Sequence, residues 1–216
     1  MCWLWYVRAV MSHKGYSGGG PMIVYQMIVA GVGGQGSVRI SHIIADAAIK
    51  EGFNVRVGEK FGAAMRGGAV SSHIRIFRGE DIAPVIPPGE ADSVMALEPL
   101  EGARAASRFL KRGGILLMNT VPIYPVDVSS GRARYPSVDE IVRRASSFAC
   151  VYALNAAELA EKAGSIRTVN SVMLGSLSGL MVLPVSRESL LSSLLEGVPR
   201  GTEEITGRHL SLEQRL

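Results

Sequence analysis

The sequence contains very little cysteine. Only Cys2 and Cys150 occur among its 216 residues, which is too few for a disulfide framework, a structural zinc site or an iron–sulfur cluster held by four thiolates. We therefore expect no metal site in this chain. Because nothing in the fold is expected to depend on disulfides, the sequence favours a reducing compartment and hence a cytoplasmic protein. Cys150 stands in a short apolar segment and is predicted to be a core residue.

Basic runs and membrane-spanning runs are also missing. The net charge is +4, but the Lys and Arg residues are scattered and are not interleaved with aromatic residues, which argues against nucleic-acid binding. The apolar segment at 169–185 contains Asn170 and is interrupted by Pro184. Its length and composition are typical of a buried helix and not of a membrane span.

The remaining composition is that of one folded domain. Hydrophobic residues make up 47% and charged residues 19% of the chain, a balance that suits a globular protein. The length fits a single domain, which we expect at residues 22–200. Residues 1–21 include a Ser-Gly-Gly-Gly-Pro run and are predicted to be a disordered extension or the product of a start placed too early. Residues 201–216 are predicted to be a C-terminal tail.

Apolar periodicity, together with the positions of glycine and proline, predicts alternating strands and helices. We expect strands at 24–30, 54–58, 69–77, 93–97, 115–119 and 150–153, and helices at 38–50, 100–111, 156–163, 169–183 and 187–196, with one more beginning at Ser137. This alternation is typical of the α/β class. It predicts a single Rossmann-like domain with an open, mostly parallel sheet and helices on both faces.

A glycine turn follows the first predicted strand. Gly31, Gly33 and Gly36 have the G-x-G-x-x-G spacing, and Gly34 and Gln35 stand inside it. Such a turn can hold the pyrophosphate of a dinucleotide at a helix N-terminus, or it can simply permit a sharp bend and close helix packing. Gln35 weighs against a nicotinamide cofactor, because a polar side chain inside the turn is more typical of contact with another loop, a partner or an acyl carrier.

A second candidate loop contains Arg66, Gly67 and Gly68. The guanidinium offers a planar fork to a carboxylate or phosphate, and the glycines allow the backbone to approach another surface. The alternative is an exposed arginine in a flexible loop.

Three polar residues elsewhere have less specific signals. Arg75 and His73, on the strand that follows this loop, are expected to be solvated or salt-bridged edge residues. Arg75 is kept as a secondary site candidate. Asn170, near the beginning of a predicted helix, is the other secondary candidate and is as suited to capping as to binding.

Three segments taken together resemble a known family. They read Gly-Val-Gly-Gly-Gln-Gly at 31–36, Met-Arg-Gly-Gly-Ala-Val-Ser-Ser-His-Ile-Arg at 65–75 and Ala-Leu-Glu-Pro-Leu-Glu at 96–101. In order and spacing they resemble the gamma-type domain of 2-oxoacid:ferredoxin oxidoreductases, and the resemblance extends over residues 24–196. Within that superfamily, the stand-alone size is most similar to the beta subunits of indolepyruvate ferredoxin oxidoreductases. The family usually has Gln where this chain has Met65.

The resemblance implies a complex that oxidatively decarboxylates an arylpyruvate to an acyl-CoA and reduces ferredoxin, in anaerobic amino-acid catabolism. It implies that thiamine diphosphate and iron–sulfur clusters belong to a larger alpha subunit and that this chain alone binds no cofactor. The loops at 31–36 and 62–68 would face the partner's thiamine site and help to form the entry for CoA or substrate. Arg66 would pair with a substrate carboxylate or a CoA phosphate, and Gln35 would hydrogen-bond across the interface.

Other functions stay open at this point. One is the gamma subunit of a pyruvate, 2-oxoisovalerate or 2-oxoglutarate ferredoxin oxidoreductase. An NAD-dependent oxidoreductase would use the glycine turn, with Glu59 binding a ribose. A third is a purely structural subunit whose glycine loops contact only a partner. No catalytic residue is identified from the sequence.

Overall fold

A computed structural model describes residues 22–62, 67–165 and 168–197. The predicted extension at 1–21 and the predicted tail at 201–216 lie outside the described residues. The strands are β1 (Met22–Val32), β2 (Asn54–Phe61), β3 (Ala69–Arg78), β4 (Ala91–Ala96), β5 (Leu110–Asn119) and β6 (Cys150–Leu154). The helices are α2 (Ser37–Lys50), α3 (Pro99–Phe109), α4 (Val126–Ser129), α5 (Val138–Ala145), α6 (Ala156–Lys162), α7 (Val169–Gly179) and α8 (Arg187–Glu196).

The six strands form one open sheet in the order β2-β3-β1-β4-β5-β6. β1, β4, β5 and β6 pair in parallel, whereas β3 is antiparallel to both of its neighbours, β1 and β2. The predicted mostly parallel sheet is therefore confirmed. The ends of the four parallel strands meet at one edge of the sheet, which we call the carboxyl edge.

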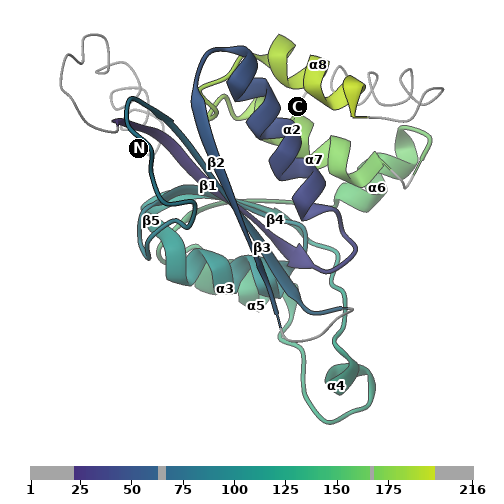
Figure 1. Ribbon diagram of the computed structural model, residues 1–216. Helices are drawn as coiled ribbons and strands as arrows, with labels where there is room; N and C mark the ends of the chain where they lie inside the picture. Colours follow the sequence, from purple (N-terminus) through teal and green to yellow (C-terminus); the bar gives the residue numbers. More distant parts are fainter. Residues whose placement is uncertain (1–21, 63–66, 166–167, 198–216) are drawn as a thin grey trace.

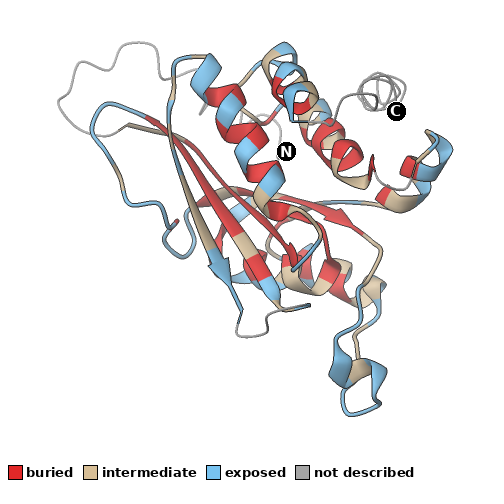
Figure 2. Cartoon of the chain, turned by 45° about the vertical axis from the view of Figure 1, so that its right-hand side comes forward, coloured by how far each residue is buried: buried red, intermediate tan, exposed pale blue. Residues whose placement is uncertain are grey.

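Helices cover both faces of the sheet (Figure 1). β1 is buried on both faces, because its side chains alternate between two apolar clusters. Met27 and Val29 pack in the cluster that includes α2, α7 and α8, and Ile28 and Ala30 pack in the cluster that includes α3 and α5. Figure 2 shows the result as buried central strands between helices whose outer sides are exposed. This arrangement fixes the carboxyl ends of β1, β4 and β5 in a well-packed frame.

Several boundaries differ from those predicted. β2 continues to Phe61 because it pairs with β3 along its whole length, so the predicted loop at 59–68 is shorter. α3 ends at Phe109 and β5 begins at Leu110, where 100–111 was expected to be helical. α7 ends at Gly179, four residues earlier than predicted, and Met181 takes a positive φ of 50° before Pro184. These ends depend on tertiary pairing and local backbone geometry, which periodicity does not report.

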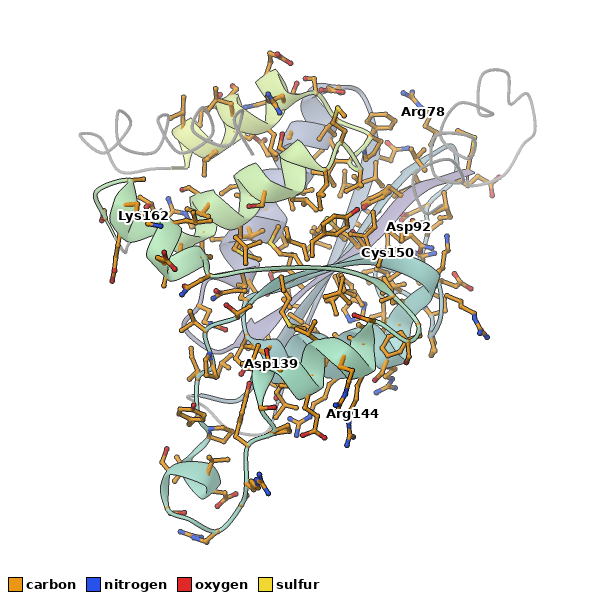
Figure 3. All side chains as sticks on the ribbon, turned by 180° about the vertical axis from the view of Figure 1, so that it is seen from behind. Arg78, Asp92, Asp139, Arg144, Cys150 and Lys162 are labelled. Atoms are coloured by element: carbon orange, nitrogen blue, oxygen red, sulfur yellow. The ribbon has the colours of Figure 1, made fainter. Side chains whose placement is uncertain are left out.

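Cys150 and the apolar helices are the subject of two predictions from composition. The prediction of Cys150 as a core residue is wrong: it is half-buried at the first position of β6, labelled in Figure 3. Within the described ranges, no helix combines the length and apolar character that crossing a bilayer would require.

Candidate functional site

The glycine turn lies at the carboxyl edge of the sheet, between β1 and α2. Gly31 is still part of β1, and Gly36 is the N-cap of α2 with a left-handed φ of 83°. Gly34 also has a positive φ, of 100°, so both positions favour glycine. The N-cap of α2 has no side-chain hydrogen bond, and the first turn of the helix contains no acidic residue. The beginning of α2 is therefore electrostatically suited to an anionic group.

Gln35 shapes this turn from the inside. Its side-chain Oε1 accepts a hydrogen bond from the backbone N–H of Val32 at 2.7 Å, and its Nε2 donates to the carbonyl of Leu97 at 2.9 Å. A Cβ on Gly31 would stand 2.6 Å from Oε1, which explains why glycine is needed there. Of the contacts expected for Gln35, with another loop, a partner or an acyl carrier, the structure contains the one with another loop, and the hydrogen bond across a subunit interface stays a prediction. Because both ends of its amide bond within the chain, its main effect is to fix the turn to the end of β4.

The second glycine loop meets the turn. The N–H of Gly33 donates to the carbonyl of Gly68 at 2.9 Å. A Cβ on Gly33 would lie 3.7 Å from both the Gly67 nitrogen and the Gly68 oxygen. The two loops singled out in the sequence thus come together at the carboxyl edge. Arg66 lies outside the described residues, and its role stays a prediction.

Asn170 joins the same site from a distant part of the chain. Its Nδ2 donates to the backbone carbonyl of Gln35 at 2.9 Å, across 135 positions of sequence. A Cβ on Gly36 would stand 2.6 Å from Nδ2. The N-cap of α7 is Thr168, and no side-chain hydrogen bond caps this helix. Asn170 therefore holds the turn and does not cap its own helix.

Two buried polar residues at the carboxyl edge had no predicted role. Asn119 is the last residue of β5; its Nδ2 donates to the Leu97 carbonyl at 3.2 Å and its Oδ1 accepts from the N–H of Ala156 at 3.1 Å. Glu98 follows β4, is 1% exposed and caps α3 by accepting from the N–H of Glu101 at 2.8 Å. The signal in the sequence is a polar residue at, or within two residues of, the end of an apolar strand.

Glu98 also accepts a hydrogen bond from the hydroxyl of Tyr135. Burial and the neighbouring carboxylate raise the pKa of Tyr135 well above its usual value. Tyr135 therefore stays protonated and acts as a donor. Glu98 is engaged as a helix cap and as the acceptor for Tyr135, so both of its carboxylate oxygens serve to position other groups.

Arg75 and His73 lie away from the turn. In the pairing of β1 with β3, Gly31 of the turn lies opposite Val70, whereas Arg75 lies opposite Gln26. Arg75 is therefore five residues further along β3 than Val70, a distance of roughly 16 Å. Its Nε donates to Oε1 of Gln26 at 2.7 Å, and its Nη1 donates to the carbonyl of Ala83. Arg75 is 8% exposed and His73 is 0% exposed. The expectation that they are solvated or salt-bridged edge residues is wrong, because β3 lies between β1 and β2 and the connection between β3 and β4 contacts both side chains.

The geometry does not favour a dinucleotide site. Glu59 lies on β2, and β3 separates this strand from β1. The Glu59 carboxylate is 3.5 Å from Nε2 of His42 on α2. In a dinucleotide-binding fold the acidic residue ends the strand next to the glycine turn, where it can reach the ribose.

Within the described residues, neither a cluster of metal ligands nor the groove between α3 and α5 coincides with the glycine turn. Among residues 22–62, 67–165 and 168–197, no three His, Cys, Asp or Glu side chains gather as metal ligands would. A groove of about 250 Å³ lies between α3 and α5 and is lined mostly by apolar side chains, among them Leu100, Ile141 and Phe148. None of its lining residues belongs to the glycine turn.

Known proteins share this sequence and fold. Residues 26–206 match the family described as pyruvate ferredoxin/flavodoxin oxidoreductase. The indolepyruvate oxidoreductase subunit IorB of Archaeoglobus fulgidus is 43% identical over 171 residues, which are 79% of this chain and 84% of that protein. The subunit of the same name from Methanothermobacter thermautotrophicus is 43% identical over 179 residues, 81% of this chain and 88% of that protein.

Two further proteins are less similar to this chain, one because the match is shorter and the other because the identity is lower. The pyruvate/ketoisovalerate oxidoreductases common subunit gamma of Thermococcus kodakarensis is 38% identical over 94 residues, 42% of this chain and 49% of that protein. The crystal structure of the keto/oxoacid ferredoxin oxidoreductase gamma subunit from Geobacter sulfurreducens superposes with a TM-score of 0.62 at 24% identity, covering 87% of this chain and 95% of that chain. This likeness shows a shared fold.

Proposed function

Because the chain belongs to the pyruvate ferredoxin/flavodoxin oxidoreductase family, we propose that it is the subunit without cofactors in a ferredoxin-dependent arylpyruvate oxidoreductase. The reaction converts an arylpyruvate such as indolepyruvate and CoA to an acyl-CoA and CO₂, and passes two electrons to ferredoxin. The observation that supports this substrate class best is the 43% identity to indolepyruvate oxidoreductase subunits over most of both chains.

The residues of this chain support placing the cofactors in the other subunit. Thiamine diphosphate and iron–sulfur clusters supply the chemistry of decarboxylation and electron transfer when they are bound. We assign them to the larger alpha subunit, because this chain has two cysteines and its described residues gather no metal ligands. Ferredoxin then reacts with the complex. The scarcity of cysteine also favours a cytoplasmic enzyme.

The carboxyl edge is the part of this chain that would face the partner's reaction centre. In open α/β sheets, ligands bind outside the carboxyl ends of the strands. Gly33 and Gly68 bring the two glycine loops together there, next to the uncapped beginning of α2. An anionic group of CoA or of the 2-oxoacid suits this position electrostatically. Arg66 is assigned to the same anion, through a bidentate contact.

A gamma subunit of a pyruvate or branched-chain oxoacid enzyme is the second candidate. It has one specific support, the 38% identity to the common gamma subunit of Thermococcus kodakarensis. That match covers 49% of the relative, against 84% and 88% for the indolepyruvate oxidoreductase subunits. The longer matches favour the arylpyruvate enzyme.

The proposal is tested with the reconstituted complex. The chain is co-expressed anaerobically with the alpha subunit, and ferredoxin reduction is followed with CoA and either indolepyruvate or pyruvate. We expect reduction that requires both subunits and CoA and that has the higher kcat/KM for indolepyruvate. A preference for pyruvate would favour the second candidate, and NAD binding by the isolated chain would point to a different class of enzyme.

The Arg66 assignment needs its own variant in this assay. Arg66→Ala should raise the KM for CoA or for the 2-oxoacid, while Arg112→Ala, at an exposed position on β5, should leave both unchanged. If the two variants behave alike, Arg66 does not contact the anion.

A further inference from the structure

A segment that projects from the body of the protein has no role in the function proposed so far. It consists of residues 121–136, which connect β5 to α5 and contain the short helix α4 (Figures 1 and 2). We call it the arm. In Figure 3, seen from behind, the arm extends below α5, the helix that carries Asp139 and Arg144. Because it begins two residues after Asn119, the end of β5, the arm is continuous with the carboxyl edge.

The arm exposes large apolar side chains. Ile123 is 42% exposed, Tyr124 57% and Val126 77%, so three such side chains stand within four consecutive positions. Elsewhere in the described part of the chain, the exposed large apolar residues are Ile49, Phe61, Val85, Tyr152 and Met181. These are far apart in sequence. Single exposed apolar residues need no explanation, but a cluster on a projecting segment is typical of an interaction site.

The arm is anchored at its base. The rings of Tyr124 and Tyr135 meet edge to face, with centroids 5.2 Å apart. Tyr135 donates its hydroxyl proton to a hydrogen bond with Glu98, the buried cap of α3. Tyr124 is therefore held, through Tyr135 and Glu98, to the end of β4.

Backbone hydrogen bonds within the arm also fix its conformation. The N–H groups of Val128 and Ser129 donate to the Pro125 carbonyl, both at 3.0 Å. Those of Arg132 and Ala133 donate to the Asp127 carbonyl at 2.8 and 3.0 Å. A segment fixed in this way loses little conformational entropy when a partner covers it.

The charge of the arm indicates what kind of surface would cover it. Arg132 and Arg134 are exposed, and Asp127 is the acidic residue of the segment. Arg132 lies 3.7 Å from Asp127 in an exposed pair, which contributes little. The complementary surface is apolar at its centre and acidic at its rim. Tyrosine and arginine are the residue types that most often carry the energy of protein interfaces.

We propose that the arm is a docking element that inserts Tyr124 and Val126 into the larger, cofactor-bearing subunit of the same complex. This rests on the proposed function. The chain belongs to a family whose related members are named as subunits, so some of its surface is covered by another polypeptide. The arm combines an apolar cluster, two exposed arginines and an anchored base at the carboxyl edge, where the glycine turn also lies, and docking there would set the turn against the partner's reaction centre.

The test compares binding of the full chain to the alpha subunit in two matched variants. Tyr124→Ser with Val126→Ser removes two side chains of the apolar cluster, and Met181→Ser removes a similarly exposed apolar side chain in the segment that follows α7. The dissociation constant is measured by titration calorimetry. We expect about thirtyfold weaker binding for the arm variant, as for an interface hot spot, and no change for Met181→Ser.

Other results overturn the proposal. Equal dissociation constants for all three proteins would show that the arm is not part of the interface. Loss of self-association in the isolated arm variant, with partner binding intact, would assign the arm to a second copy of the chain. A lower free energy of unfolding for Val126→Ser alone in the isolated chain would mean that another part of the chain covers the arm, whereas Tyr124→Ser also removes the contact with the Tyr135 ring. If the wild-type chain does not bind the alpha subunit at all, the proposed function itself fails.

Discussion

At the scale of single residues, the pKa of His73 depends strongly on the burial of its ring. It is fully buried on β3, and its Nδ1 accepts a hydrogen bond from the N–H of Ile86 at 3.3 Å. Burial, with added repulsion from Lys60 and Arg108, lowers the pKa of His73 from 6.5 to about 4. The ring is therefore neutral in the folded protein at neutral pH.

This pKa predicts a loss of stability in acid. Between pH 6.5 and about 4 the unfolded chain binds a proton at His73 that the folded chain excludes, so the free energy of unfolding falls as the pH falls through this window. The loss should be on the order of 3 kcal/mol by pH 4, at about 1.4 kcal/mol per unit of pKa. Urea unfolding across this range measures it.

His73→Asn should remove this pH dependence, because the amide oxygen can still accept from Ile86 but does not titrate in the window. His42→Asn is the matched control, since His42 is exposed on α2. If the slope of wild-type stability against pH survives in His73→Asn, the loss has another origin.

Asn170 gives a second prediction at this scale. Asn170→Ala removes the hydrogen bond to the Gln35 carbonyl and should lower the free energy of unfolding by about 1 kcal/mol. Asn170→Asp should cost more, because a carboxylate would face a carbonyl oxygen. Asn54→Ala, which removes a comparable bond to the Gly79 carbonyl at an exposed position, should cost less than either. Equal losses for the Ala variants in thermal or urea unfolding would show that Asn170 does not hold the turn.

These residues also mark a limit of prediction from sequence. The glycine turn and Gln35 could be recognised because their spacing is local. The partner of Asn170 is 135 positions away, and the segment that buries His73 and Arg75 comes from the connection after β3. No local pattern indicates such long-range contacts.

At the scale of elements, most strands and helices could be predicted because each has its own periodicity or apolar run. The order of the strands could not. β3 separates β2 from β1, and this arrangement depends on pairing between distant segments. It matters for function, since it moves Glu59 away from the glycine turn and removes the physical basis of a dinucleotide site.

Packing of α3 on β4 can be tested with two helical glycines. A Cβ on Gly102 would stand 2.0 Å from the Cβ of Ala96, whereas one on Gly179 of α7 would meet nothing within 4 Å. Gly102→Ala should therefore lower the free energy of unfolding by roughly 1–3 kcal/mol or more, through overpacking. Gly179→Ala should leave it unchanged or raise it by about 0.5 kcal/mol, because alanine favours a helix. Similar effects of the two changes in urea unfolding would contradict this close approach.

At the scale of the whole molecule, the fold presents one functional edge. Four features lie where the parallel strands end: the glycine turn, the second glycine loop, the buried polar residues Glu98 and Asn119, and the base of the arm. In the function we propose, the chain would contribute one side of a site that binds an anionic group and contacts a partner, and the cofactors of the larger subunit would complete that site. With such a shared site, a subunit that carries no cofactor of its own can still belong to an oxidoreductase family.

Hydrogen–deuterium exchange of the full chain, with and without the alpha subunit, shows which surface of the chain the partner covers. The account predicts that binding slows exchange at Gly34 and Gly36 of the turn, at Gly67, and in the arm at 121–136, while the outer sides of α2 and α8 exchange as before. Protection confined to α2 and α8, with the turn and the arm unchanged, would show that the carboxyl edge does not face the partner and would contradict the account.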